Sequence, residues 1–346
     1  YGSDVGGRRT PWIIGGMIVL ALGGTGAALG TALMVSSPGA GTALAVVAFI
    51  LIGLGAGAAG TSLLVLLAKQ VPAERKAAAA TIVWIMMIAG FAVTAGVAGQ
   101  FLDPFSPRRL VEVTSVVSLA AVMVTLLALY RLEGRGETGS GAATSQGAGL
   151  SPGFRQALIE VWQEPGARRF TLFVFVSMLA YSAQDLILEP YAGTVFGMTP
   201  GQSTQLSGIQ HAGVLLGMVV VAVTGTLLRQ AGPALLRYWT VGGCIASALA
   251  LAGIAFGGSV GTAWPLAANV FCLGVANGAF AVAAIASMMT LASHGQARRE
   301  GLRMGLWGAA QAIAFGLGGF LGTVAIDLMR QLVAEPALAY ALVFSG

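Results

Sequence analysis

Long apolar runs separated by short polar segments are the main pattern of this chain. A helix crosses a hydrocarbon core of about 30 Å with about 20 residues, because each residue adds about 1.5 Å. A tenth, shorter apolar run begins near Ala337 and reaches the last residue, Gly346. The pattern predicts an all-α membrane protein with nine complete spans, at 11–34, 42–68, 77–102, 110–131, 170–189, 203–228, 235–256, 263–292 and 303–327.

The composition agrees with this interpretation. Of the 346 residues, 56% are hydrophobic and 9% are charged, and the mean hydropathy is +0.84. Since a soluble domain has about 25% charged residues, these values exclude a soluble globular protein and a disordered chain. Cys244 and Cys272 lie in apolar runs and cannot form a disulfide framework. The chain opens at Tyr1, without an initiator Met, and we expect it to be a fragment that lacks both ends.

The cations alternate from one connection to the next. All but three of the 18 Lys and Arg fall in alternate connections, beginning with the segment before the first span. The opposite connections carry only Arg108, Arg109 and Arg330. Because Lys and Arg collect in cytoplasmic loops, the cation-rich set is predicted to be cytoplasmic. The net charge of +5 then follows membrane orientation and does not indicate a nucleic-acid partner.

A segment rich in Gly, Ser and Thr interrupts the apolar pattern near the middle of the chain. It begins after Leu132, reads EGRGETGSGAATSQGAGLSPG, and predicts a flexible cytoplasmic linker. The following FRQALIEVWQEPGARR predicts a short amphipathic helix on the membrane face. We therefore expect three parts: the remainder of an N-terminal six-helix half (1–132), the linker with its short helix (133–168), and a C-terminal half truncated at the last span (169–346).

The two halves resemble each other in sequence. A shift of 223 residues superposes five notable pairs, namely Gly55 on Gly278, Arg75 on Arg298, Trp84 on Trp307, Gly96 on Gly319 and Gly99 on Gly322. The shift crosses an even number of spans, so the two copies have the same polarity in the membrane. A parallel pseudo-repeat of two six-helix bundles is the plan of major facilitator transporters, and we predict that fold.

Three stretches of sequence resemble known families. YGSDVGGRRTPWI resembles the cytoplasmic loop motif of the major facilitator superfamily, in which an acidic residue precedes Gly and two Arg. AQDLILEPYAGTVFGMTPG and RMGLWGAAQAIAFGLGGFLGTVAID resemble the PucC family, also called the bacteriochlorophyll delivery family, of phototrophic bacteria. The resemblance covers essentially all 346 residues. The short first loop is closer to the branch labelled bacteriochlorophyll synthase chain than to the light-harvesting assembly factors.

This resemblance implies a twelve-helix protein, of which spans three to eleven are complete here. It implies that the protein binds or delivers bacteriochlorophyll, or a precursor, for the assembly of photosynthetic complexes. The implied partners are the lipid bilayer, the pigment, and membrane proteins of light harvesting or pigment synthesis. The implied location is the bacterial inner membrane, including its intracytoplasmic photosynthetic part.

Asp4, Arg8 and Arg9 stand at the cytoplasmic entrance of the first span. One interpretation is a charge latch that holds the two halves together in one conformation and releases them in the other. The other interpretation is that these charges only set the topology. The resemblance to the superfamily favours the latch.

Tyr181, Asp185 and Glu189 recur at i, i+4 and i+8, so they share one face of a helix. Ionisable groups inside a span are costly and normally face a cavity or a partner. Two carboxylates one turn apart also repel each other, which predicts either a protonated carboxyl or a neighbouring cation. A salt bridge between the halves and a gate or proton site both stay open.

His211 is the only histidine inside a predicted span, and Gln210 precedes it on a polar stripe with Ser203 and Ser207. A neutral imidazole is a natural axial ligand for a tetrapyrrole metal. A hydrogen-bonded histidine in a cavity is the alternative.

Trp307 and Gln311 lie one helical turn apart, beside several glycines of the same span. A large planar side chain next to glycines favours a flat slot for a macrocycle, if the resemblance is taken into account. The glycines alone indicate only close helix packing.

The sequence points away from catalysis. Neither Lys69 nor Lys76 closes a GxxxxGK[ST] loop, so we expect no ATP site. Prenyl-transfer enzymes need clustered aspartates to hold magnesium and diphosphate, but the four aspartates are isolated, at positions 4, 103, 185 and 327. We therefore expect no catalytic residues and no metal site.

Two other functions stay open at this point. One is secondary transport of a small amphipathic solute, and the other is an assembly scaffold that binds no pigment. LIGLGAGAAG resembles the proton-antiporter motif of the superfamily, but Leu51 stands where that motif has Arg. This difference argues against ordinary drug/proton antiport.

Overall fold

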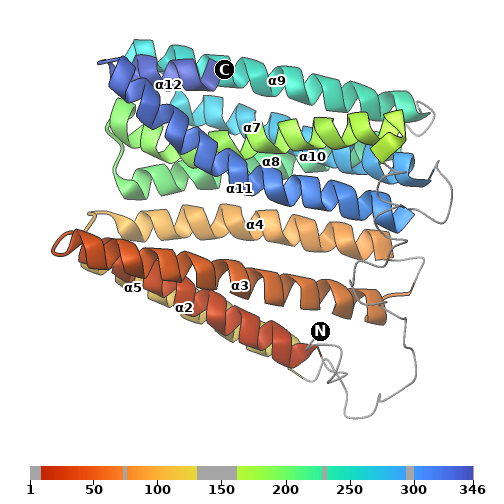
Figure 1. The fold of residues 1–346 in the computed structure, drawn as a ribbon, viewed down its shortest axis with the longest axis horizontal. Coiled ribbons are helices and arrows are strands. Elements are labelled where there is room, and N and C mark those ends of the chain that lie inside the picture. The colour runs from red at the N-terminus through yellow and green to blue at the C-terminus, as the bar shows by residue number, and fades with distance from the viewer. Residues whose placement is uncertain (1–8, 73–75, 131–161, 228–231, 294–299, 346) are drawn as a thin grey trace. The chain divides into compact units, whose positions relative to one another are not determined.

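The computed structural model describes residues 9–72, 76–130, 162–227, 232–293 and 300–345, and these residues are almost entirely helical (Figure 1). In this part of the chain, nine helices are long and apolar enough to cross a membrane. The helices are α2 (Thr10–Met34), α3 (Pro38–Gln70), α4 (Lys76–Leu102), α5 (Pro107–Leu129), α7 (Pro165–Phe196), α8 (Pro200–Leu227), α9 (Gly232–Val260), α10 (Leu266–Ser293), α11 (Glu300–Leu332) and the shorter α12 (Pro336–Ser345). The expected all-α class and the number of complete spans are confirmed.

Proline begins many of these helices. Pro38, Pro107 and Pro165 are the first residues of α3, α5 and α7. Proline suits this position because the first turn of a helix does not use its backbone N–H groups. At α5 the hydroxyl of Ser106 also accepts a hydrogen bond from the Arg109 amide, at 3.1 Å. The polar breaks in the apolar pattern therefore coincide with specific helix starts.

Helix α7 is longer than the apolar pattern predicts. The expected span 170–189 stops before Pro190, whereas α7 runs from Pro165 to Phe196 with Pro190 in its interior. The helix ends at Gly197, whose φ of 67° lets the Met198 amide donate to the Ala192 carbonyl at 3.2 Å. The expected helix end at Glu189 is therefore wrong, and residues 165–168 of the expected linker belong to α7. The rest of that linker, up to residue 161, lies outside the described residues.

The described helices form two units. The first contains α2 to α5 together with residues 199–205, and the second contains α7, the rest of α8, and α9 to α12. In the first unit, α2 contacts α3 and α5, and α4 also contacts α3 and α5. In the second unit, α9 contacts α10 and α12, and α11 also contacts α10 and α12. Since the shift of 223 residues places α2 on α9 and α3 on α10, the same pattern of helix contacts occurs twice.

Glycine brings some of these helices into backbone contact. A Cβ added to Gly217 of α8 would collide with the Val275 carbonyl of α10, and one added to Gly278 of α10 would collide with the Val214 carbonyl of α8. Small residues allow this close approach, which is typical of helix pairs in membranes. Gly55, the repeat partner of Gly278, instead lies against the backbone of α2. The paired glycines therefore both serve packing, but against helices that do not correspond.

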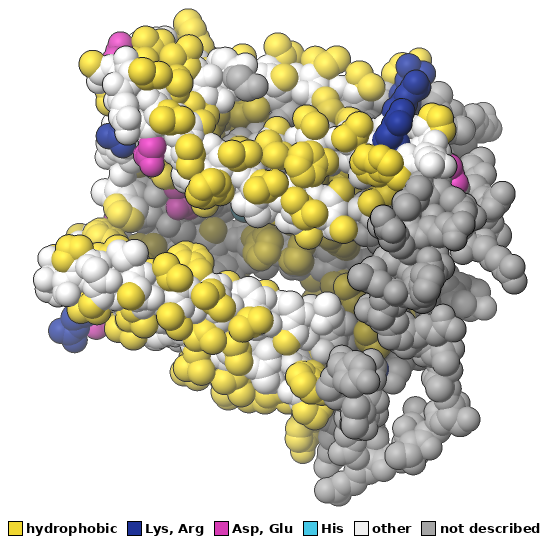
Figure 2. Space-filling view, viewed as in Figure 1, with side chains coloured by type: hydrophobic (Ala, Val, Ile, Leu, Met, Phe, Trp, Pro, Cys, Tyr) yellow, Lys and Arg dark blue, Asp and Glu magenta, His cyan; other side chains and the backbone are white. Residues whose placement is uncertain are grey.

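Large hydrophobic side chains cover the outside of the helices. Figure 2 shows them along the helix lengths, with Lys and Arg near the helix ends. On α9, Leu249 is 69% exposed and Phe256 is 60% exposed, and on α5 Leu119 is 64% exposed. Such surfaces are unfavourable in water but suit contact with lipid.

Candidate functional site

Two acidic residues of α7 meet two polar residues of α8 in the second unit. Gln210 donates from Nε2 to Oδ1 of Asp185 at 3.3 Å, and Ser207 donates from Oγ to Oε1 of Glu189 at 2.9 Å. Gln210 is only 1% exposed, whereas both carboxylate residues are exposed. We call Asp185, Glu189, Ser207, Gln210 and His211 the α7–α8 polar face. It presents two carboxylates that are held from behind by neutral donors.

The imidazole of His211 is oriented by its own helix. Its Nδ1 lies 2.8 Å from the carbonyl oxygen of Ser207, and the side chain is half-buried. In a neutral ring this contact places the proton on Nδ1, so the lone pair is on Nε2. The expected polar stripe is therefore present, although Ser203 bonds locally to the Pro200 carbonyl at 3.1 Å.

Tyr181 shares the helix face of Asp185, but its ring packs in another direction. The ring lies edge-on to Phe315 of α11, with centroids 6.0 Å apart and planes inclined by 72°. The neighbouring Ser182 donates to the Phe315 carbonyl at 2.8 Å. Tyr181 therefore contributes to the packing of α7 against α11, beside the α7–α8 polar face.

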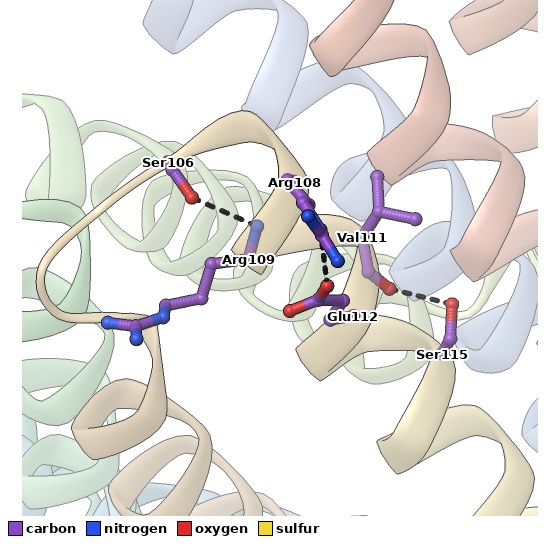
Figure 3. Close-up of polar contacts among 6 residues, drawn as sticks. All are labelled: Ser106, Arg108, Arg109, Val111, Glu112 and Ser115. Atoms are coloured by element: carbon purple, nitrogen blue, oxygen red, sulfur yellow. Dashed lines mark hydrogen bonds and ion pairs between the residues drawn. The ribbon is translucent and has the colours of Figure 1, made fainter.

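The cations that the sequence offers to the α7 carboxylates have partners of their own. On α5, Arg108 forms an ion pair with Glu112 at 2.7 Å, and Arg109 donates to a backbone carbonyl of the preceding loop at 3.2 Å (Figure 3). The Arg108 pair is largely exposed, so it contributes little to stability. Arg330 lies in the last turn of α11, where a cation is favoured by the helix dipole.

Of the expected charge latch, the structure describes only Arg9, because Asp4 and Arg8 lie outside the described residues. Arg9 is 5% exposed, and its carbonyl accepts the amides of Trp12 and Ile13, both at 3.1 Å. Arg9 therefore caps the start of α2 with its backbone and is packed within the first unit.

Trp307 is packed inside the second unit. Its ring is 0% exposed and lies edge-on to Phe170, with centroids 4.9 Å apart. Its repeat partner Trp84 is 43% exposed on α4. Gln311, one turn after Trp307, is half-buried. This geometry favours the packing interpretation of Trp307 over a stacking surface for a macrocycle.

The glycines of α11 also serve packing. Gly318 lies against the Leu179 backbone, and Gly322 lies against the Ala183 backbone, both on α7. A Cβ added to Gly316, by contrast, would meet nothing within 4 Å. Close contact between α7 and α11 thus explains most of this glycine pattern.

Sequence reasoning missed several polar contacts between helices. Asn277 of α10 accepts a hydrogen bond from Ser247 of α9 at 2.8 Å, and Asn269 donates to the Ala250 carbonyl at 2.8 Å. Gln184 of α7 is 7% exposed, and its Nε2 has no hydrogen-bond partner among the described residues. The signal for these residues was simply an amide side chain inside an apolar run, because such groups bind across helices in membranes.

Known proteins resemble this chain over almost its whole length. The family model described as PUCC protein matches residues 2–346. The chain is 50% identical over 345 residues to the bacteriochlorophyll synthase 44.5 kDa chain of Rhodobacter capsulatus, which covers 99% of this chain and 78% of that protein. It is 28% identical over 348 residues to Protein PucC of the same organism, with 96% and 71% covered. It is also 28% identical over 352 residues to Protein PucC of Rhodovulum sulfidophilum, with 98% and 75% covered.

These matches include the helices that carry the α7–α8 polar face. Together with the nine apolar helices, they indicate a multi-pass membrane protein. The resemblance expected from the sequence motifs is confirmed. This chain belongs to the PucC family.

Proposed function

We propose that this chain binds bacteriochlorophyll, or a precursor of it, in the membrane and delivers it during the assembly of photosynthetic complexes. Membership of the PucC family supports this function, as does the 50% identity to a protein named bacteriochlorophyll synthase 44.5 kDa chain. The observation that carries the proposal is the α7–α8 polar face, where His211 stands with two carboxylates in apolar helices. Ionisable groups inside spanning helices normally serve a ligand, an ion or a proton.

The chemistry of His211 suits this pigment. Imidazole nitrogen is a common axial ligand of tetrapyrrole metals, and bacteriochlorophyll carries a magnesium ion that takes such a ligand. The contact between Nδ1 and the Ser207 carbonyl orients the ring and leaves Nε2 as the basic nitrogen. Outer partners orient metal-binding histidines in the same way. His211 would hold the magnesium, and Gln210 would keep Asp185 fixed beside it.

The fold that we propose for this function is the two-bundle major facilitator fold. Its support is the pattern of helix contacts that recurs between α2–α5 and α9–α12 at the shift of the sequence repeat. In this fold each half moves as a body around a central site. Arg9, together with Asp4 and Arg8, would then act as the charge latch on the cytoplasmic side.

We propose that the protein handles pigment without catalysing its synthesis. Attachment of a prenyl tail would require carboxylates grouped around magnesium and diphosphate. In the described part of the chain, Asp103 follows α4, Asp185 lies in α7, and Asp327 lies in α11. The word synthase in the relative's name would then refer to a chain that serves a synthetic complex.

Absorption spectroscopy of the purified protein tests this function. Protein isolated from pigmented cells should carry bacteriochlorophyll, and His211→Leu should lose most of that pigment while it still inserts and folds. Thr204→Leu is a matched control on α8, since the Thr204 hydroxyl bonds only to the Pro200 carbonyl of its own helix in the described structure.

The two alternatives give different results in the same experiment. A secondary transporter would carry no pigment and would move a small solute in vesicles. A scaffold would carry no pigment and would still bind light-harvesting proteins. Equal pigment in the wild type and in His211→Leu would remove His211 as the ligand.

A further inference from the structure

A hollow of about 600 Å³ lies between α8, α9 and α10 in the second unit. It contains none of the residues of the α7–α8 polar face. Small residues of α9 and α10 form most of its wall, including Gly242, Ala246, Ala276 and Ala279. The volume falls within the range of about 300–1,000 Å³ that ligand sites occupy. The hollow is therefore large enough for a ligand, and it is separate from the proposed pigment site.

The hollow lies on the lipid-facing side of α9. Tyr238 and Cys272, which line it, are exposed. Next to it on α9, Val241 is 50% exposed and Ile245 is 57% exposed. Because α9 is one of the nine spanning helices, this surface meets the bilayer. The occupant is therefore a component of the membrane.

The polar groups of the hollow are gathered at one end. Thr224 is near the end of α8, and Tyr238 and Trp239 are near the start of α9. From Leu235 to Ala246, α9 rises by about 16 Å, which is half of a hydrocarbon core of about 30 Å. Trp and Tyr concentrate at the level of lipid headgroups. The hollow thus runs from headgroup level towards the middle of the bilayer, over the depth of one leaflet.

Trp239 supplies a hydrogen-bond donor at the polar end. Its indole Nε1 is buried and has no partner among the described residues. A buried indole N–H usually finds an acceptor, so an acceptor on the occupant would satisfy it.

We propose that this hollow binds one acyl chain of a membrane phospholipid, whose ester carbonyl accepts a hydrogen bond from Nε1 of Trp239. The acyl chain matches the apolar wall and the depth of one leaflet. The ester carbonyl matches the donor at headgroup level. The bound lipid fills the space between α9 and its neighbours and supports their packing.

Native mass spectrometry of the chain purified in mild detergent tests this site. Gly242→Leu fills the hollow, because a Cβ at Gly242 meets nothing within 4 Å, and leucine is favoured over glycine in a helix. Trp239→Phe removes the donor and keeps an aromatic ring. Gly53→Leu is the matched control, since Gly53 is also exposed on a spanning helix with nothing within 4 Å of its Cβ.

The wild type and Gly53→Leu should each retain one phospholipid, identified by its mass. Gly242→Leu should reduce that retention by roughly ten-fold or more. Trp239→Phe should weaken it by roughly five-fold, which corresponds to the loss of one hydrogen bond. Equal phospholipid in all four proteins would overturn the proposal. A pigment or a protein segment in the hollow of the wild type, in place of a phospholipid, would overturn it as well.

Discussion

Asp185 and Glu189 depend on their partners to different extents. Gln210, which donates to Asp185, is 1% exposed, whereas Ser207, which donates to Glu189, is half-buried. A buried amide that loses its acceptor pays about 1–3 kcal/mol, and a half-buried hydroxyl loses less because it finds another acceptor. The contact of Asp185 with Gln210 is therefore the stronger link between α7 and α8.

A double-mutant cycle on Asp185 and Gln210 measures this link. Asp185→Leu leaves the Gln210 amide without its acceptor, and adding Gln210→Leu removes the stranded group. We expect the double variant to be more stable than the sum of the single effects by about 1 kcal/mol, measured by thermal unfolding in detergent. The matching cycle on Glu189 and Ser207 should give a smaller coupling. Additive effects at Asp185 and Gln210, within about 0.3 kcal/mol, would contradict the structure.

The sequence predicted the residues of this face better than their partners. Helical spacing was sufficient to place Asp185 and Glu189 on one face and His211 on a polar stripe, because spacing fixes direction within one helix. It did not predict that Gln210 would be the donor to Asp185, or that Ser182 would bond to Phe315. Those contacts depend on which helix stands next to which, and a single sequence does not contain that information.

Among the helices, the contact between α8 and α10 depends on glycine. Gly278→Ala should destabilise the protein by more than about 1 kcal/mol, because the added methyl would collide with the Val214 carbonyl and push the helices apart. Thermal unfolding in detergent measures this change.

Gly57→Ala on α3 is the control for this prediction. A Cβ there meets nothing within 4 Å, so the variant should be equally stable or slightly more stable, by up to about 1 kcal/mol. If both variants had the same stability as the wild type, close packing of α8 on α10 would be excluded.

The helix boundaries show what an apolar pattern can and cannot predict. The starts at Pro38, Pro107 and Pro165 follow from local chemistry, since proline suits the first turn. Pro190 has the same chemistry but lies inside α7, where contacts of Tyr191 hold the helix together. The Tyr191 hydroxyl donates to the Ile254 carbonyl of α9 at 2.5 Å, and the side chain is 0% exposed. Tertiary packing thus overrides the tendency of proline to end a helix.

For the molecule as a whole, the repeat predicted from five residue pairs reappears in the helix contacts. It does not extend to every side chain, because Trp84 is 43% exposed and Trp307 is 0% exposed. The environment of each tryptophan is set by the neighbours of its helix, and these differ between the two units. Sequence repeats therefore predict the arrangement of helices within a unit better than they predict the site.

Labelling of single cysteines tests the orientation of the whole chain. In a variant without Cys244 and Cys272, a membrane-impermeant thiol reagent should label cysteines that replace Ser37, Thr262 and Glu335 from the periplasmic side. These positions are exposed in the connections that carry few cations. The expectation follows from the alternation of Lys and Arg.

Cysteines in the cation-rich connections are the control for this orientation. At positions 73, 140 and 295, which lie outside the described residues, they should react only after the cells are opened. One reversed pair would contradict the predicted alternation and the parallel repeat.

The central claim is that the α7–α8 polar face binds bacteriochlorophyll through its magnesium, and a titration of the purified chain tests it most directly. Bacteriochlorophyll and its magnesium-free form, bacteriopheophytin, have nearly the same ring and tail, so their comparison isolates the metal. The wild type should bind bacteriochlorophyll at least roughly ten-fold more tightly, which is the effect of about 1.4 kcal/mol of binding free energy. His211→Leu should bind the two pigments equally. Equal binding of both pigments by the wild type, or no binding of either, would contradict the account.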